Sequence, residues 1–256
     1  MTDYTSQWSI CLLVEEEKPV KYTCAAEAQT MFAHVTARAE AKGMKVNDSK
    51  TGLMCVSSAR SFTPRAVIRG RQNEEIKSCD SIKFLGFTLD SDYSIKTHVN
   101  NLCRKLRARS WALSRLKRKG MSIKDLVVVY TSIIRPVVEY AAAAWHSMLT
   151  CKQSEDLERQ QVQALKNIVG PGISARKMRE YLGIEPLSER RSKAVLKLAI
   201  KCSISEIFSN WFPVRPDPVY SRREGVSYNR FIEETCRTDR RKNSPLCYMK
   251  KRLNNQ

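Results

Sequence analysis

The stretch "LCRKLRARSWALSRLKRKG", residues 102–120, decides how the rest of the chain is interpreted. It contains eight lysines and arginines and no carboxylate. Apolar side chains recur at helical spacing from Val99 to Leu116, and Gly120 is well placed to end a helix. The segment therefore predicts an amphipathic helix over about 95–119. The apolar stripe consists of Val99, Leu102, Cys103, Leu106, Leu113 and Leu116.

The polar face of this helix is unusually basic. Arg104, Arg107, Trp111, Arg115 and Arg118 follow one another at steps of three, four, four and three, which is one continuous face. Like charges at these spacings destabilise a helix by roughly 0.2–0.5 kcal/mol per pair, so an anionic partner is the simplest reason for them. The alternative is a solvated face. Trp111 can stack on a sugar or base, or pack against a neighbouring helix.

The charge of the whole chain is unevenly distributed. The 256 residues carry a formal net charge of +19. Residues 1–95 hold 12 basic and 12 acidic side chains, whereas residues 96–256 hold 33 and 14. The entire excess lies in the second part, which predicts two regions with different roles and a polyanionic partner for the second.

The remaining composition predicts an intracellular protein, nuclear or cytoplasmic. Nine cysteines are scattered without a C-x-x-C motif, which argues against a secreted disulfide framework. The three histidines are far apart in sequence, so no metal site is expected. No uninterrupted apolar run reaches the roughly 18–20 residues of a membrane span, so no membrane partner is expected either.

The predicted fold class is α+β, mainly α. Residues 25–90 predict one helix beside a small, mainly antiparallel sheet, with Met31, Phe32, Val35 and Ala39 on the inner face of the helix. "SIKFLGFTLD", residues 81–90, has the pattern of one strand covered on both faces, with a bulge at Gly86. The predicted domains are 1–93, a helical bundle over 94–209, and an extended, irregular basic tail over 210–256.

The second helix of the predicted bundle is its most apolar. Ser122 and Asp125 have capping-box spacing, and the following residues are apolar nearly all round, as in a central buried helix. Pro136 is expected to kink this helix or to end it near Arg135.

Five motifs follow one another in order along the chain: "GMKVNDSKT" (43–51), "IKFLGFTLDSD" (82–92), "IIRPVVEYAAAAWHSMLT" (133–150), "LERQQVQALKNIVG" (157–170) and "KNSPLCYMKKRLN" (242–254). Together they resemble the C-terminal part of the reverse transcriptase of non-LTR (LINE-like) retrotransposons, over roughly residues 25–255. This resemblance implies the end of a polymerase palm in residues 1–93, followed by a helical thumb.

The resemblance also implies roles for individual residues. Phe84, Leu85 and Gly86 match the hairpin that holds the primer end, although sheet core with a bulge explains them equally well. Lys50 matches a lysine proposed to protonate the leaving pyrophosphate, and the alternative is a surface lysine in a turn. The thumb holds the backbone of a template–primer duplex, RNA–DNA or DNA, which requires cations on a rigid element and little base reading.

One departure from the family affects activity. Such polymerases, which are nucleotidyltransferases, hold two divalent metal ions with carboxylates that include a Tyr-x-Asp-Asp pair. No Asp-Asp dipeptide occurs in this sequence. We therefore expect no polymerisation by this chain alone, no cofactor in it, and Mg²⁺ only in a complete parent polymerase whose palm and fingers would be its partners. The alternative is a stand-alone, non-enzymatic nucleic-acid-binding helical protein.

Further polar residues have less specific patterns. Asp90 and Asp92 have the "DSD" pattern of a turn and helix N-cap rather than a metal site. Trp145 and His146 are expected in the core of the bundle. A second basic cluster is either a solvated helix start or a duplex contact; it consists of Arg190, Arg191, Lys193 and Lys197.

Overall fold

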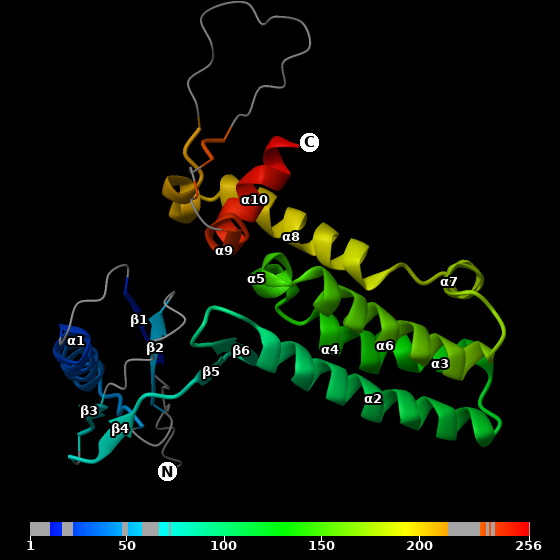
Figure 1. Cartoon of the computed structure of the whole chain (residues 1–256), viewed down its shortest axis with the longest axis horizontal. Helices are drawn as coiled ribbons and strands as arrows, with labels where there is room; N and C mark the ends of the chain where they lie inside the picture. Colours follow the sequence, from blue (N-terminus) through cyan, green and yellow to red (C-terminus); the bar gives the residue numbers. More distant parts are fainter. Residues whose placement is uncertain are drawn as a thin grey trace, which may run out of the picture. The chain divides into compact units, whose positions relative to one another are not determined.

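The computed structural model of the chain describes residues 11–16, 23–47, 51–57, 67–71, 73–214, 231–233, 236 and 239–255. It divides into two compact units, Met1–His98 and Val99–Gln256 (Figure 1). The sequence placed this boundary between residues 93 and 94.

Unit 1 contains one helix and three pairs of strands. Helix α1 spans Thr23–Glu40. Strand β1 (Cys11–Glu16) pairs in parallel with β2 (Gly52–Ser57). Strands β3 (Val67–Arg69) and β4 (Glu75–Lys77) form an antiparallel hairpin, as do β5 (Ser81–Phe84) and β6 (Phe87–Asp90). The parallel pair follows from α1, because a helical crossover lets two successive strands run in the same direction.

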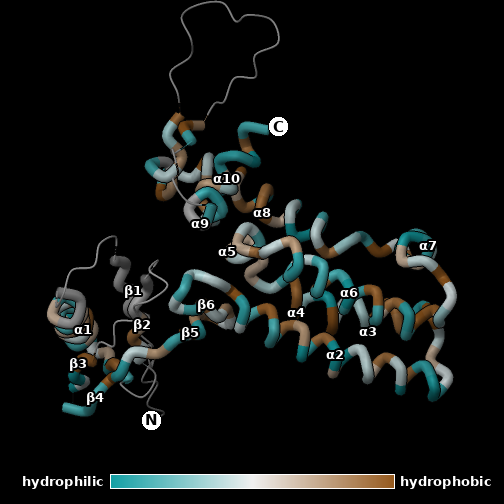
Figure 2. Tube along the Cα trace, in the orientation of Figure 1, coloured by the Kyte–Doolittle hydropathy of each residue, from teal (hydrophilic) through white to brown (hydrophobic). Residues whose placement is uncertain are grey.

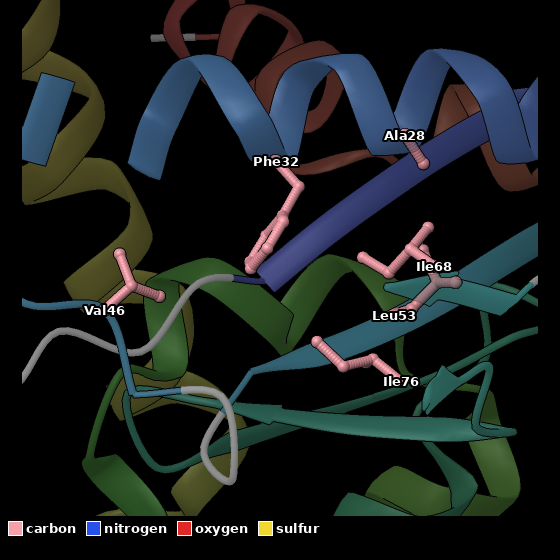
Figure 3. Close-up of a cluster of buried hydrophobic side chains, with 6 residues drawn as sticks. All are labelled: Ala28, Phe32, Val46, Leu53, Ile68 and Ile76. Carbon is pink, nitrogen blue, oxygen red and sulfur yellow. The ribbon is translucent and has the colours of Figure 1, made fainter. Parts of the chain in front are cut away.

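The main core of unit 1 lies between α1 and the strands. Ala28 and Phe32 point from α1 toward Leu53, Ile68 and Ile76 (Figure 3). Val46, after the helix, completes this cluster. The predicted inner face is correct for Phe32 and for the partly buried Ala39, and wrong for Met31 and Val35, which are exposed. The buried face instead follows Ala28, Phe32 and Thr36, one turn apart.

Residues 81–90 form a hairpin, so the prediction of one strand with a bulge at Gly86 is wrong. Leu85 (φ 47°) and Gly86 (φ 85°) form a two-residue turn in the left-handed region, which matches the twist of the flanking strands. Phe84 and Leu85 are exposed at its tip instead of covered. Ile82 packs on Met54 in a second small cluster.

Asp90, the last residue of β6, caps the helix that follows and Asp92 forms the turn before it, as their pattern predicted. Asp90 Oδ2 accepts hydrogen bonds from Ser94 Oγ and from the backbone amide of Thr97, each at 3.1 Å. Asp92 Oδ1 accepts one from the Ser94 amide at 2.9 Å. These bonds fix the start of α2.

Unit 2 is helical in its described residues. Its elements are α2 (Lys96–Arg118, which begins just before the unit boundary), α3 (Ile123–Val129), the π-helical turn η2 (Tyr130–Ile134), α4 (Arg135–Glu139), α5 (Ala142–Trp145), the 3-10 turn η3 (His146–Met148), α6 (Cys151–Val169), α7 (Ala175–Leu182), α8 (Leu187–Ser203), the 3-10 turn η4 (Glu206–Trp211), α9 (Asp239–Lys242) and α10 (Pro245–Asn254).

The predicted cap at the start of α3 is confirmed. At Pro136 the predicted end of the helix near Arg135 does not occur, and the alternative, a kink, stays a prediction. The Ser122 side chain accepts a hydrogen bond from the Asp125 amide. Pro136 lies in the first turn of α4, directly after the π-helical turn. A proline is tolerated in a first helical turn, so the helix continues past Arg135 to Glu139.

The segment Ile123–Met148 is long and apolar enough, by length and composition, to cross a membrane. Its mean hydropathy is 1.4 over a window that is 28% buried. Prediction from the sequence missed this segment because it looked for an uninterrupted apolar run, and Arg135 and Glu139 interrupt the run. In the bundle its inner side is buried through Leu126, Tyr130, Ile134 and Val138.

The C-terminal region is partly helical, so the prediction of an extended irregular tail is wrong for residues 239–254. Met249 of α10 packs in a core cluster with Val195 and Ala199 of α8. Asn254 Oδ1 accepts a hydrogen bond from the Phe231 amide at 2.9 Å, and its Nδ2 donates to the Phe231 carbonyl at 3.0 Å. Leu246, Met249 and Leu253 follow one another at helical spacing and form the apolar side of this helix. The lysines near them in the sequence obscured the pattern.

Candidate nucleic-acid interface

Helix α2 has one buried and one exposed side, as its sequence predicted. Val99, Leu102, Leu106 and Leu113 are buried. Asn167 of α6 donates from Nδ2 to the carbonyl of Ser110 at 2.9 Å and to its hydroxyl at 2.8 Å. These bonds join α2 to α6, which run side by side in Figure 1. Hydrophobic and hydrophilic residues recur in turn along α2 (Figure 2). The rotation of α2 about its axis is therefore fixed.

The exposed side of α2 carries the five residues that the sequence brought together. Arg104, Arg107, Trp111, Arg115 and Arg118 are all exposed. None of the four arginines forms an ion pair with a residue that the structure describes. We call this set the α2 face. It presents four positive charges to solvent.

Trp111 on this face supports a neighbouring arginine. The indole is 59% exposed, so it does not pack in the bundle core. The guanidinium carbon of Arg115 lies 4.7 Å from the centroid of its ring. This distance is typical of a cation–π interaction, which restricts the positions that the Arg115 guanidinium can adopt. Sequence reasoning considered stacking on a base and packing on a helix, and it missed this pairing.

Two other cations of the basic stretch differ from what charge alone suggests. Lys119 is exposed and follows directly on Arg118, the last residue of α2, so it extends the α2 face by one cation. Arg109 points elsewhere, because its Nη1 donates to the carbonyl of Ile133 at 2.5 Å. It joins α2 to the π-helical turn and has a structural role.

Three of the four residues in the predicted second basic cluster are buried or paired, and the fourth, Lys197, is exposed. Arg191 is fully buried, and its Nη2 donates to Ser154 Oγ at 3.2 Å. Arg190 bonds both carboxylate oxygens of Glu139, and this hydrogen-bonded partner raises the pKa of its guanidinium. Lys193 pairs with Glu185 at 2.6 Å. The prediction that Arg190 and Arg191 contact a duplex is therefore wrong for Arg191, which is inaccessible, and unsupported for Arg190, which is neutralised by Glu139.

A polar network holds the helices behind this cluster. Glu158 of α6 accepts from Arg179 Nη2 through Oε2 and from the Ser188 amide through Oε1, each at 2.7 Å. Buried Gln161 donates to the Tyr130 hydroxyl at 3.1 Å and to the Glu185 carbonyl at 3.0 Å. Polar side chains on α6 thus link η2, α7 and the start of α8. Such a network stabilises one arrangement of these helices because each buried group has its partner.

Trp145 and His146 lie inside the bundle, as predicted. Trp145 is fully buried, and its Nε1 donates to the carbonyl of Tyr140 at 3.1 Å. Burial, and then the charges of Arg191 and Arg252, lower the pKa of His146 to about 4. The imidazole is therefore neutral at neutral pH. No catalytic role follows from this geometry.

The structure describes some of the candidate residues of unit 1 and not others. Lys50 lies outside the described residues. Phe84, Leu85 and Gly86 form the exposed tip of the β5–β6 hairpin. The hairpin implied by the resemblance is present, and its contact with a primer stays a prediction.

Other surfaces offer less defined chemistry. A pocket of about 1010 Å³ lies along α6, and its cations are accompanied by Glu155 and Glu158. This mixture of charges makes it a weaker anion site than the α2 face. Among the described residues, no group of three or more His, Cys, Asp or Glu side chains is arranged to hold a metal ion.

Known proteins with similar sequences come from retrotransposons. A probable RNA-directed DNA polymerase from transposon X-element of Drosophila melanogaster is 27% identical over 128 residues, which is 48% of this chain and 13% of that protein. A putative 115 kDa protein in the type-1 retrotransposable element R1DM of the same organism is 27% identical over 113 residues, 42% of this chain and 11% of that protein. No family model and no solved structure matches.

These relatives confirm the resemblance to retrotransposon reverse transcriptases over about half of the chain. The chain spans little more than a tenth of the length of the relatives that it matches.

Proposed function

We propose that this chain binds the backbone of a nucleic-acid duplex through the α2 face, as the thumb-like region of an RNA-directed DNA polymerase. The relatives support a reverse-transcriptase-related origin. The α2 face supports the binding: its four arginines are exposed on one helix, Lys119 follows directly, and none of the four arginines forms an ion pair with a described residue. Phosphate contacts of this kind position a duplex without reading its sequence.

The α2 face is better suited to phosphates than the rest of the cationic surface. Many lysines and arginines elsewhere in unit 2 are paired, as Arg179 is with Glu158 and Arg190 with Glu139. A phosphate would have to compete with these carboxylates. On α2 the mutual repulsion of the arginines is relieved only by an external anion, so association with a duplex stabilises the helix as well as the complex.

The test is duplex binding measured over a series of salt concentrations. Neutralising about four or five phosphates gives a slope of roughly −4 in a plot of log affinity against log salt concentration. Changing Arg104, Arg107, Arg115 and Arg118 together to Ala should weaken binding to an RNA–DNA duplex strongly and flatten this slope toward zero. Fluorescence anisotropy with a labelled duplex measures both quantities.

A matched control removes cations that have partners. Arg176 and Lys193 pair with Glu180 and Glu185 on the surface. Their change to Ala should leave the slope nearly unaltered. Equal losses for each charge removed in the two variants would show that net charge, rather than the α2 face, determines binding.

Polymerisation by this chain alone is not part of the proposal. The sequence lacks an Asp-Asp pair, and two-metal chemistry needs carboxylate ligands. Primer extension on an RNA template with Mg²⁺ or Mn²⁺ should therefore give no product. A metal-dependent product abolished by chelation would contradict this expectation.

A second candidate function is that of a stand-alone nucleic-acid-binding protein. The concentration of the whole +19 in residues 96–256, without the metal-binding pair, favours it. Comparison of duplex types separates the two candidates. A template–primer thumb should prefer a duplex with a recessed primer end over a blunt duplex, whereas a general backbone binder should bind both equally.

A further inference from the structure

A group of buried polar atoms in unit 2 has no hydrogen-bond partner among the described residues. It comprises Nε and Nη1 of Arg191, Nε of Arg252, the Ser147 hydroxyl and Nδ1 of His146. Buried polar atoms in proteins are nearly always hydrogen-bonded, and an exception usually marks a bound water or ion. Five such atoms in one region therefore require an explanation.

These atoms come from three elements that are in mutual contact. His146 and Ser147 belong to η3, Arg191 to α8 and Arg252 to α10, and each pair of these elements packs together. Arg191 and Arg252 both lie close enough to the His146 imidazole to lower its pKa. The ring of Tyr248 closes one side of the imidazole, with centroids 5.7 Å apart. The unpartnered atoms therefore gather around η3.

The charge of this region is positive and not neutralised at hydrogen-bonding distance. The carboxylate oxygens of Glu139 are bonded by Arg190, and those of Glu158 by Arg179 and the Ser188 amide. Arg191 is fully buried, with its guanidinium 5.9 Å from the ring centroid of Trp145. Glu158 and Glu139 attract the Arg191 charge without bonding to it. A buried charge without a hydrogen-bonded ionic partner is unfavourable, so an anion in this position would stabilise the fold.

We infer that Arg191, Arg252, Ser147 and His146 form an internal binding site for a small inorganic anion such as chloride. The guanidinium groups and the hydroxyl supply hydrogen-bond donors, and a neutral imidazole can supply one more from Nδ1. Such a set suits an acceptor with no hydrogens of its own. A water molecule would bring two hydrogens, and of these five atoms only the imidazole nitrogen and the hydroxyl oxygen could accept them. Because Arg191 and Ser147 are buried, the site suits a small ion better than a bulky one.

The site is tested by thermal unfolding of the full chain at constant ionic strength, with chloride replaced stepwise by the bulkier methanesulfonate. An anion that binds only the folded state raises the midpoint with the logarithm of its concentration above Kd. For a unit of this size we expect a rise of about 3–5 °C for each tenfold increase in chloride. Broadening of the chloride-35 NMR signal by the folded protein provides a direct second readout.

Variants separate a specific site from general salt effects. Arg252→Met removes one donor from a half-buried position, and Ser147→Ala removes another with little change in volume. Both should reduce the chloride dependence and the line broadening. Arg176→Met, on the exposed surface of α7, removes the same charge and should preserve both. Equal stabilisation by methanesulfonate, equal chloride dependence in every variant, or no chloride dependence in the wild type would each overturn the site, the last in favour of bound water.

Discussion

The guanidinium of Arg115 lies over the indole ring of Trp111, one helical turn away, on a side of α2 that is open to solvent. An exposed indole usually costs solubility without a structural gain, whereas here it holds a charge in place. A restrained guanidinium loses less side-chain entropy when it meets a phosphate than a free one does. Trp111 thus contributes to the α2 face by holding Arg115 in place rather than by stacking on a base.

Replacing Trp111 should weaken duplex binding without removing a phosphate contact. A cation–π pair at an exposed site contributes about 0.5–1 kcal/mol, so Trp111→Leu should lower the affinity for an RNA–DNA duplex about two- to fivefold. The salt slope should stay as in the wild type, because no charge is lost. Trp111→Phe should recover part of the loss. Trp211→Leu, at another exposed indole, is the control. A tenfold or greater loss that Phe cannot restore would favour base stacking instead.

Arg190 should contribute to stability and not to nucleic-acid binding. Its bonds to both oxygens of half-buried Glu139 join α8 to α4. Arg190→Ala leaves that carboxylate without its main partner, and we expect a loss of about 1–3 kcal/mol in the free energy of unfolding. Denaturant unfolding measures this loss, and duplex affinity should stay within twofold.

Arg176→Ala is the matched control for this change. Its ion pair with Glu180 is highly exposed and should be worth less than about 1 kcal/mol. If Arg190→Ala cost no more than Arg176→Ala and weakened duplex binding, the assignment of Arg190 to the duplex contact would have to be restored.

The contrast between α2 and α8 shows which parts of the candidate site could be predicted from the sequence. On α2 the arginines and the leucines occupy opposite sides, so the periodicity alone identified the exposed residues. On α8 Arg190 bonds the carboxylate of Glu139, 51 positions away in the chain, and Arg191 lies against the indole of Trp145, 46 positions away. Local spacing contains no information about Glu139 or Trp145, so a buried guanidinium and a surface one looked the same.

The hairpin and the C-terminal helix were missed for related reasons. The pattern of residues 81–90 has apolar residues on both sides of Gly86, which suits a buried strand as well as two short ones. Only the backbone at Leu85 and Gly86, both with positive φ, decides between them. In α10 the lysines hid an apolar stripe whose partner on α8 lies about 50 residues earlier.

His146 should make the stability of unit 2 depend on pH. Burial, Arg191 and Arg252 lower its folded-state pKa to about 4 from an ordinary value of 6.5. Between these values the unfolded chain binds a proton that the folded chain does not, so stability rises with pH over this window and is fully present above 6.5. The slope cannot exceed about 1.4 kcal/mol per pH unit, and partial exposure of the imidazole makes it smaller.

The measurement is denaturant unfolding of the wild type and His146→Gln at pH 4.5, 5.5 and 6.5, with the anion concentration fixed. The difference between the two proteins isolates His146 from the carboxylates that titrate in the same range. The wild type should gain stability with pH relative to the variant. A constant difference would mean that His146 titrates normally.

Cys236 and Cys247 should form a disulfide under mild oxidation. Their Sγ atoms lie 3.9 Å apart, and Cys247 belongs to α10. Oxidised glutathione would accept the two electrons and two hydrogens of the thiols and leave as two reduced molecules. The product would link Cys236 to α10 and stabilise the chain by about 2–3 kcal/mol.

Mass spectrometry after digestion identifies the link by the loss of two hydrogen atoms from the joined peptides. Cys247→Ser should abolish it, whereas Cys151→Ser, at an exposed cysteine on α6, should not. A mixed disulfide of Cys247 with glutathione as the stable product would show that the two thiols do not reach each other.

Leu85 should be replaceable by a residue that makes unit 1 more stable. It is 75% exposed and has φ 47°, a backbone region that costs an ordinary side chain about 1 kcal/mol and that Asn tolerates. Leu85→Asn should therefore raise the free energy of unfolding of unit 1 by about 0.5–1 kcal/mol. Lys83→Asn, in the adjacent strand with ordinary backbone geometry, should give no gain. Template–primer binding by the same variant then tests the tip itself: a more stable protein with weaker binding to a recessed-end duplex would assign Leu85 to the primer end, whereas unchanged binding would leave the hairpin with a structural role alone.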